Sequence, residues 1–467
     1  MSHTEDLKGS ILFLGLLIFS LLITILTAQG AEELDLDTAI KEAVENNPKI
    51  REVIQRELWA SEERASQSKD LLFKLSTSYT YTRLKEEPYT IFPNQALNML
   101  IDKLNNLPLP GPPSPKIPHM PDRITVADRD RVTWEITMTQ PLFTGFALIS
   151  KKRIAELGID IAQYEREVAL LELTRQVKRA YFNLLLAKRA LEIAQDECNQ
   201  LEAHLKDAEK FFKEGLVAHN DVLKSQVALA NALQKRVKAE AELETAISFL
   251  NILIGRPIGE ATRIKEVEPV PTPQGELISL YEEALRNRPE MALMDRRLKQ
   301  AGLAIKIAKS NHYPQIYLVG QYQRVGDDLA ASRNEFGNDH NASISVVAKM
   351  SLFEWGKTQN EVNKAVHTKA QVEEKLRQLK DEILLEVKQA YENIKVATAS
   401  VDTAKAARIQ ARENFRITNL QYQEGITTST EVLDARAYLT QAENNYFRAL
   451  YGYKLAEVDL LKAIGKR

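Results

Sequence analysis

The chain has 467 residues, and its 62 basic and 64 acidic side chains leave a formal net charge of only −2. This balance offers no concentrated basic surface for nucleic acid, so no nucleic-acid partner is expected. The single cysteine excludes an intrachain disulfide, and the seven histidines are scattered without the spacing of a metal site. The sequence also lacks a phosphate-binding glycine motif. We therefore expect no enzyme activity, no cofactor and no bound metal.

The N-terminal segment has the features of a secretory signal peptide. Lys8 precedes an apolar run from Ile11 to Leu26, and small residues follow up to Gly30. We expect residues 1–30 to be removed by cleavage after Gly30. The alternative is an uncleaved membrane anchor, because the apolar run is nearly long enough to span a bilayer. Either alternative takes the rest of the chain out of the cytoplasm.

The mature chain begins with helical sequence and then changes period. Helices are predicted over 34–70, with a break at Pro48, which cannot continue a preceding helix. A strand is predicted over 73–83, because apolar and aromatic residues alternate with polar ones. Its apolar face carries Phe73, Leu75, Tyr79 and Tyr81.

A proline-rich segment over 84–130 follows and holds more than half of the chain's 17 prolines. We predict a loop that is stiff and extended in places. It is either a plain surface loop or a functional loop that acts as a cap or in recognition. The sequence does not distinguish between these two alternatives.

The first half ends with a second strand and two long helices. The strand is predicted over 131–140, with Trp134, Ile136 and Met138 on its apolar face. Helices are predicted over 146–214 and 220–254. The first has about 70 residues and a length on the order of 100 Å, which a compact globule does not need. A proline-rich linker over 256–275 follows.

The second half repeats this order. Helices are predicted over 276–311, 357–424 and 429–464, and strands over 315–324 and 341–350, the last with Ile344 and Val346 on its apolar face. One face of the first long helix carries a seam of large and small apolar residues in coiled-coil spacing, the first seam: Leu173, Val177, Ala180, Leu184, Ala187, Leu191 and Ala194. A shift of 210 residues gives the second seam: Ile383, Val387, Ala390, Ile394, Ala397, Val401 and Ala404.

Two structural repeats, 31–255 and 276–467, therefore make up the chain. Pro48 matches Pro289 at an offset of 241 residues, which exceeds the seam offset by 31. The proline-rich segment over 84–130 accommodates these extra residues in the first repeat.

Strands of about ten residues with one apolar face are typical of a transmembrane β-barrel. The alternative is a half-buried sheet covering a soluble core. Four strands cannot close a barrel, and an open edge in lipid leaves backbone groups without partners. A membrane location therefore requires several chains to pool their strands.

The chain resembles the TolC-type outer-membrane channel family. The resemblance is carried by the repeated order of elements, by the strand-to-helix junction 140–145, and by the turn sequences 215–223 and 425–433. It implies a mainly α fold with a small β part, in which three copies pool twelve strands into a transmembrane β-barrel continued by a periplasmic α-barrel. The implied location of the protein is the outer membrane of a Gram-negative-type cell, where the barrel contacts the outer-membrane lipid.

The same resemblance implies a passive exit duct of a tripartite efflux pump or a type I secretion system. The implied partners are a periplasmic adaptor (membrane fusion) protein and an inner-membrane transporter of RND, ABC or MFS type. A periplasmic coiled-coil adaptor or scaffold is the alternative, although an adaptor typically has one long hairpin rather than two.

The helical tips receive roles from this resemblance. Asp221, Tyr422, Glu431 and Asp434 match residues of the family's periplasmic gate, where two acidic rings favour cations. Thr427 stands where the family has an arginine, so the gate is more weakly held or differently bonded. The expected adaptor contacts are the two turns, with Gly215, Leu216, Val217, Gly425 and Ile426.

Overall fold

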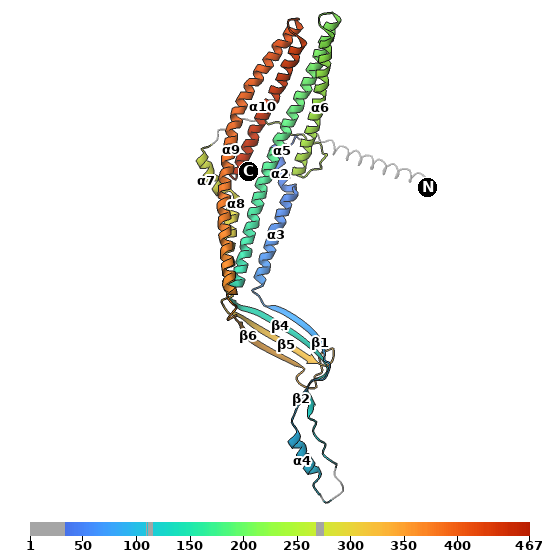
Figure 1. Ribbon diagram of the computed structural model, residues 1–467, viewed down its shortest axis with the longest axis vertical. Helices are drawn as coiled ribbons and strands as arrows, with labels where there is room; N and C mark the ends of the chain where they lie inside the picture. Colours follow the sequence, from blue (N-terminus) through green and yellow to red (C-terminus); the bar gives the residue numbers. More distant parts are fainter. Residues whose placement is uncertain (1–32, 109, 111–114, 268–274) are drawn as a thin grey trace, which may run out of the picture. The chain divides into compact units, whose positions relative to one another are not determined.

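The structure is a computed structural model that describes residues 33–108, 110, 115–267 and 275–467. The predicted signal peptide and part of the predicted linker lie outside these residues. The described chain is mainly helical with a small β part, as predicted (Figure 1). No helix among the described residues combines the length and the apolar character needed to cross a bilayer.

The chain divides into two compact units. The first comprises residues up to Ala60 together with Gly158–Leu298 and Gln371–Arg467, and the second comprises Ser61–Leu157 and Lys299–Ala370. Both predicted repeats contribute to both units, because the dividing positions fall inside long helices rather than in the linker between the repeats.

Two long helical hairpins make up most of the first unit. Their outgoing helices α5 (Ala147–Lys213) and α9 (Lys357–Gln423) have 67 residues each, and they return as α6 (His219–Ile254) and α10 (Ser429–Ala463). These bounds differ from the predicted ranges by one residue at several ends, which is the usual variation of helix termini. The shorter helices are α2 (Leu36–Asn46), α3 (Pro48–Lys69), α7 (Leu277–Asn287) and α8 (Pro289–Ser310).

The two seams lie in two separate cores. The first four residues of the first seam, Leu173 to Leu184, pack with residues of α2, α6 and α10, and Val177 among them is fully buried. The second seam packs with residues of α7 and α10, and Val387 is its fully buried equivalent. Burial of the alternating large and small side chains is the main stabilisation of these long helices.

In each repeat, the residue before the proline closes the end of the return helix. Asn47 donates from its side-chain nitrogen to the Leu253 carbonyl at 2.9 Å, near the end of α6. Arg288, its counterpart, donates to the Ala463 carbonyl at 3.3 Å, at the end of α10. These bonds satisfy carbonyls that a helix end leaves without intrahelical partners.

A glycine follows both return helices for a steric reason. Gly255 and Gly465 have φ angles of 78° and 77°, which L side chains rarely adopt. A Cβ on Gly255 would lie 2.5 Å from the Asn46 side chain, and one on Gly465 would lie 2.9 Å from the Asn287 backbone. The ends of α6 and α10 are therefore built in the same way.

The second unit contains an antiparallel sheet with the strand order β1-β4-β5-β6. The strands are β1 (Lys74–Arg83), β4 (Asp130–Thr144), β5 (Gln315–Gly326) and β6 (His340–Lys349). β4 continues four residues past its predicted end because a register shift after Pro141 accommodates the proline. Phe73, predicted on a strand, lies one residue before β1.

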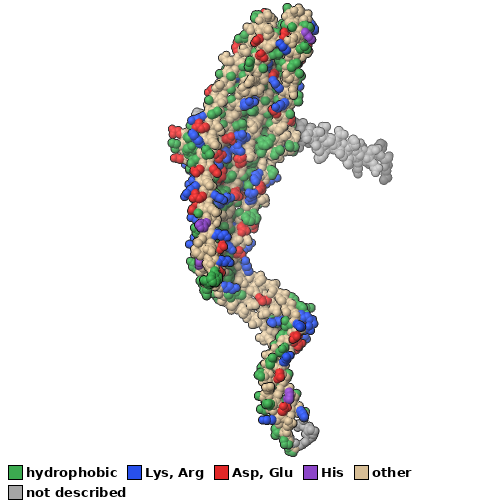
Figure 2. Space-filling model, in the orientation of Figure 1, with side chains coloured by type: hydrophobic (Ala, Val, Ile, Leu, Met, Phe, Trp, Pro, Cys, Tyr) green, Lys and Arg blue, Asp and Glu red, His purple; other side chains and the backbone are tan. Residues whose placement is uncertain are grey.

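The strand register separates an apolar face from a polar face. Leu75 pairs with Met138, which in turn lies opposite Gly320, and directly paired residues share a face. Eight predicted apolar residues fall on this one face: Leu75, Tyr79, Tyr81, Trp134, Ile136, Met138, Ile344 and Val346. Figure 2 shows few charged side chains over the visible part of the sheet, whereas both signs of charge are interspersed along the helices.

The proline-rich segment is not only a loop, which corrects the prediction. It contains the paired short strands β2 (Tyr89–Ile91) and β3 (Arg123–Thr125) and the helix α4 (Gln95–Asn105). Residues 95–105 contain no proline, so a helix of three turns fits between the proline clusters.

Candidate functional site at the helical tips

Each helical hairpin turns through the same tight structure at its tip. Gly215 and Gly425 adopt φ angles of 73° and 72°, and the next residue in each case donates its backbone N–H to the carbonyl five positions earlier. This Schellman arrangement ends α5 and α9. It leaves Leu216 and Ile426 projecting, with 68% and 73% of their surface exposed. Both predicted contact turns therefore present an apolar residue to solvent.

Three buried side chains join the two hairpins just behind the turns. His204 of α5 lies with its Nε2 2.8 Å from the hydroxyl of Ser429, the first residue of α10. The Ser225 hydroxyl of α6 lies 3.3 Å from the same Ser429 hydroxyl. We refer to His204, Ser225 and Ser429 as the His204 cluster. It was missed from the sequence because its members belong to three different helices.

Tyr422 packs on this cluster near the end of α9. Its ring centroid lies 4.8 Å from that of His204 and 5.5 Å from that of Phe211, and only 2% of the residue is exposed. The Asp221 carboxylate acts electrostatically on its hydroxyl and the Ser429 hydroxyl lies nearby, but no described residue meets the Tyr422 hydroxyl in full hydrogen-bond geometry. Within one chain, the predicted tyrosine–aspartate pair is thus brought near but not bonded.

Burial keeps the aromatic groups of the tip uncharged near neutral pH. It lowers the pKa of His204 below 6.5, although the carboxylates of Asp207 and Asp221 act in the opposite direction. Burial likewise raises the pKa of Tyr422, and Asp221 adds to this shift. The two rings therefore stack as neutral groups.

The predicted acidic pair is exposed, unlike the buried His204 cluster. Glu431 and Asp434 are exposed in the single chain, on the first turns of α10. The backbone N–H of Glu431 donates to the Thr428 hydroxyl, which caps the helix, and a carboxylate here also interacts favourably with the helix dipole. Thr427 is half-buried beside this cap.

An arginine does take part in the tip, nine residues beyond Thr427. Arg436 is 1% exposed and donates to the Gln200 side chain at 2.8 Å and to the Asp196 carboxylate at 3.2 Å. Its guanidinium also lies 5.6 Å from the centre of the Phe415 ring. Arg436 therefore links α10 to both α5 and α9. It was missed from the sequence because its partners lie on other helices.

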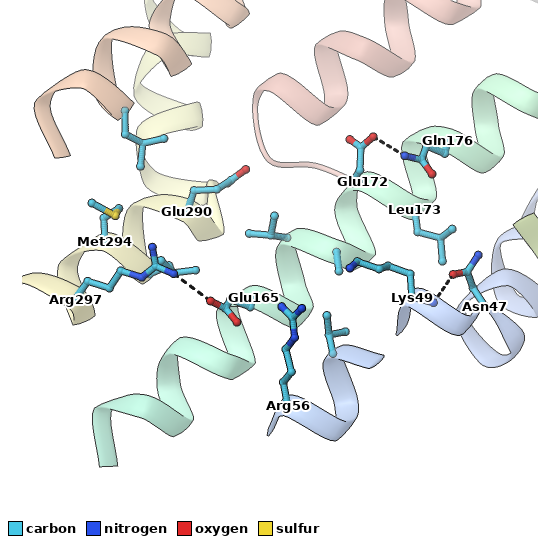
Figure 3. A pocket seen from close by; sticks show the side chains of 15 residues that line it. Asn47, Lys49, Arg56, Glu165, Glu172, Leu173, Gln176, Glu290, Met294 and Arg297 are labelled. Carbon is cyan, nitrogen blue, oxygen red and sulfur yellow. Dashed lines mark hydrogen bonds and ion pairs between the residues drawn. The ribbon is translucent and has the colours of Figure 1, made fainter. Parts of the chain in front are cut away.

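A cavity of about 730 Å³ lies farther from the tips in the first unit, among α3, α5, α8 and α9 (Figure 3). Its floor is apolar, and every charged side chain of its lining is ion-paired within the chain. The Glu165–Arg297 pair, at 3.1 Å, is an example. The described residues contain no group of three metal-ligating side chains here or elsewhere. The cavity is thus a groove between helices, lined by apolar and ion-paired side chains.

The chain has the parts of an outer-membrane channel subunit. These are a sheet with one apolar and one polar face, and two long helical hairpins with matched tips. The sequence profile of the family described as outer membrane efflux protein matches residues 39–256 and 280–466. The chain therefore belongs to the outer membrane efflux protein family. This confirms the predicted resemblance, the outer-membrane location and the role as an exit channel.

Individual relatives and solved structures agree with this family. The outer membrane protein TolC of Vibrio cholerae is 26% identical over an alignment that covers 62% of this chain and 67% of the relative. The alkaline protease secretion protein AprF of Pseudomonas aeruginosa is 21% identical, with 70% and 68% covered. A crystal structure of CusC superposes with a TM-score of 0.75 at 16% identity, covering 94% of this chain and 93% of that one. The last comparison shows that the fold is shared.

Proposed function

We propose that the chain forms a homotrimeric exit duct that conducts substrate passively from a periplasmic adaptor and an inner-membrane transporter across the outer membrane. The observation that carries this proposal is that the chain leaves two kinds of surface without a partner: the outer strands of the sheet and an exposed apolar row on α6. The four-stranded sheet has β1 at one side and β6 at the other, and both strands are exposed along their length.

The sheet edges support association through strand pairing. An exposed edge strand offers unpaired backbone donors and acceptors, which are costly in a lipid environment. Pairing β1 of one copy with β6 of the next would satisfy both edges. Three copies would give twelve strands, with the apolar face directed toward lipid and the polar face toward the lumen.

The helix α6 supports association through side-chain packing. Its outer face has exposed apolar residues at intervals of three, four and seven, which is the spacing of a packing seam. We call this row the α6 edge row: Leu223, Val227, Ala230, Val237 and Ala241. A helix of a second copy, packed along this row, would close the wall between neighbouring chains.

The tips support a gate and a docking point for the adaptor. Rings of Glu431 and Asp434 from three copies would favour cations at the aperture. Asp221, Tyr422 and Thr427 would lie next to this aperture, with the His204 cluster holding the two hairpins of each copy together. The turns at Gly215 and Gly425, with exposed Leu216 and Ile426, would meet the adaptor, which joins the duct to an inner-membrane transporter of RND, ABC or MFS type.

Membrane fractionation with electrophoresis tests the assembly. We expect a heat-sensitive trimer band in unheated samples of outer membranes, and cation-selective single channels when the purified protein is added to planar bilayers. A variant with Glu431→Gln and Asp434→Asn should lose most of this selectivity. Recovery of the chain as a soluble periplasmic monomer would instead support an adaptor or scaffold and would overturn the proposal.

A further inference from the structure

The proline-rich segment forms an arm that extends the β1–β4 hairpin. Backbone hydrogen bonds continue past the sheet from Leu84 N–H to the Arg129 carbonyl at 2.8 Å, and from Val126 N–H to the Pro88 carbonyl at 2.9 Å. The β2–β3 pair follows, and α4 lies beyond it, as Figure 1 shows. The arm is therefore an ordered continuation of two strands, with a helix at its far end.

One side of α4 is held by the returning chain. Asn98 accepts from the Met120 N–H at 2.9 Å and donates to the Met120 carbonyl at 3.1 Å. Asn105, two turns farther along, makes the same pair of bonds with Ile117, at 2.7 and 2.8 Å. The two asparagines fix the rotation of α4 about its axis relative to the rest of the arm.

The side of α4 away from these bonds carries exposed leucines, and Leu107, two residues past the end of the helix, continues the row, which we call the leucine stripe. Its members are Leu97, Leu100, Leu104 and Leu107, with 45%, 57%, 48% and 53% of their surface exposed. Their spacing of three, four and three residues is that of a coiled-coil seam. Four adjacent leucines in contact with water cost free energy that a packing partner would recover, about 25 cal/mol for each Å² of apolar surface covered.

We propose that the leucine stripe packs against the leucine stripe of neighbouring copies, so that the α4 helices associate outside the barrel. This inference rests on the proposed trimer, in which the three arms extend from equivalent strands. The stripe consists of the same residue type at every position, which suits a self-complementary contact between identical helices.

The composition of α4 itself favours this occupant over a lipid surface. Helices that lie on membranes carry several Lys or Arg residues beside their apolar face. The only basic residue in α4 is Lys103, and Asp102 neutralises its contribution to the net charge of the helix. An isolated helix of 11 residues would be marginal in water, but the asparagine bonds hold α4 in place before it meets its partner. The trimer itself would supply a high effective concentration.

Cysteine cross-linking in intact cells tests the inference. In a Cys198→Ala background, Leu100→Cys should form a disulfide between chains on mild oxidation, at least about ten-fold more than Met99→Cys. Met99 is the matched control because it is 69% exposed and lies next to Leu100 but off the stripe. Substitution of Leu104 by Asp in the Leu100→Cys chain should abolish the cross-link without dissociating the trimer.

The possible results separate this inference from the proposed function. A trimer that forms normally while Leu100→Cys and Met99→Cys cross-link equally, or not at all, would overturn the α4 association alone. Protection of Leu100→Cys from a membrane-impermeant maleimide without cross-linking would overturn it in favour of a lipid or another protein. Absence of the trimer from outer membranes would instead overturn the proposed duct.

Discussion

The helices α5 and α9 are copies of one sequence pattern, yet they occupy different environments. Both bury their seams, and the equivalent residues Leu184 and Ile394 are each 2% exposed. They differ on the neighbouring face. On α5, Phe182 and Leu185 belong to the core, whereas their counterparts at the 210-residue offset on α9 are Glu392 and Lys395, which face solvent.

This difference distinguishes a central helix from an edge helix. Tyr181 of α5 donates its hydroxyl hydrogen to the Lys265 carbonyl at 2.6 Å and is fully buried, and burial raises its pKa to about 12. The equivalent Tyr391 is half-buried beneath Lys395. The two helices thus keep the same seam but differ on the neighbouring face. On α5 this face completes the core within the chain, and on α9 it stays exposed at the edge.

The largest expected effect comes from exchanging equivalent residues between the core face of α5 and the exposed face of α9. Leu185→Lys places the α9 residue into the core of α5, where an unpaired ammonium is buried. We expect a loss of roughly 3–5 kcal/mol of stability, measured by thermal and denaturant unfolding. The reciprocal Lys395→Leu is the control and should change stability by about 0.5 kcal/mol or less, because the site is exposed. Equal effects of the two substitutions would contradict the distinction between central and edge helices.

A charge on the α6 edge row should break assembly rather than folding. Val237 is 59% exposed in the single chain, so Val237→Asp leaves the monomer intact but buries a carboxylate in the proposed contact. We expect at least about a ten-fold loss of trimer in outer membranes, with unchanged helicity by circular dichroism. Asn231→Asp adds the same charge at an exposed position outside the row and should assemble normally. Normal trimer yield from Val237→Asp would remove α6 from the interface.

Acidification should loosen the tips moderately. Because burial lowers the pKa of His204 below 6.5, the unpacked tip takes up a proton more readily than the packed tip. Packing is therefore most stable above pH 6.5 and weakens as the pH falls below that value. Asp207, Asp221, Tyr422, Ser225 and Ser429 surround the ring and define its electrostatic environment.

Hydrogen exchange of residues 421–433, compared with His204→Gln at each pH, measures this effect. We expect the ratio of wild-type to variant exchange rates to rise about three- to ten-fold between pH 7.5 and 5.5. Glutamine can bond the Ser429 hydroxyl but does not titrate in this range. A constant ratio would show that His204 protonation does not control the packing of the tip.

The smallest effect is expected at the predicted gate pair. Tyr422→Phe alone keeps the ring stacking and removes a hydroxyl that has no bond within the described chain, so conductance should change little. Together with Asp221→Ala, it should raise single-channel conductance if this pair helps to close the aperture between copies. Gln423→Ala, at an exposed neighbouring position, serves as the control. Unchanged conductance of the double variant, with assembly intact, would exclude these two residues from the gate.

Periodicity was sufficient to predict the long helices and the strands to within a few residues. The exceptions have local causes. The predicted end of β4 at Gln140 relied on Pro141, but a register shift lets the strand continue. In the proline-rich segment, the density of proline concealed α4, even though Leu97, Leu100 and Leu104 already had helical spacing.

The candidate site was less accessible to sequence reasoning. The predicted tip residues follow from the turns, which are local. The His204 cluster depends on a contact between His204 and Ser429, 225 residues apart, and His204 belongs to no motif. Arg436 is similar, because its partners lie on a different helix. Pairings of this kind depend on how the hairpins pack, which a single sequence does not specify.

The capped helix ends near Asn47 and Arg288 have a mechanical consequence. At these joints the hydrogen-bond ladders of α6 and α10 stop, while those of α5 and α9 continue without a break. Resistance to bending at this level therefore depends on the two continuous helices and on the caps. Both joints also hold an ion pair: Arg256, just past α6, pairs with Glu42 of α2 at 2.7 Å, and the buried Arg288 pairs with Glu386 of α9 at 2.8 Å.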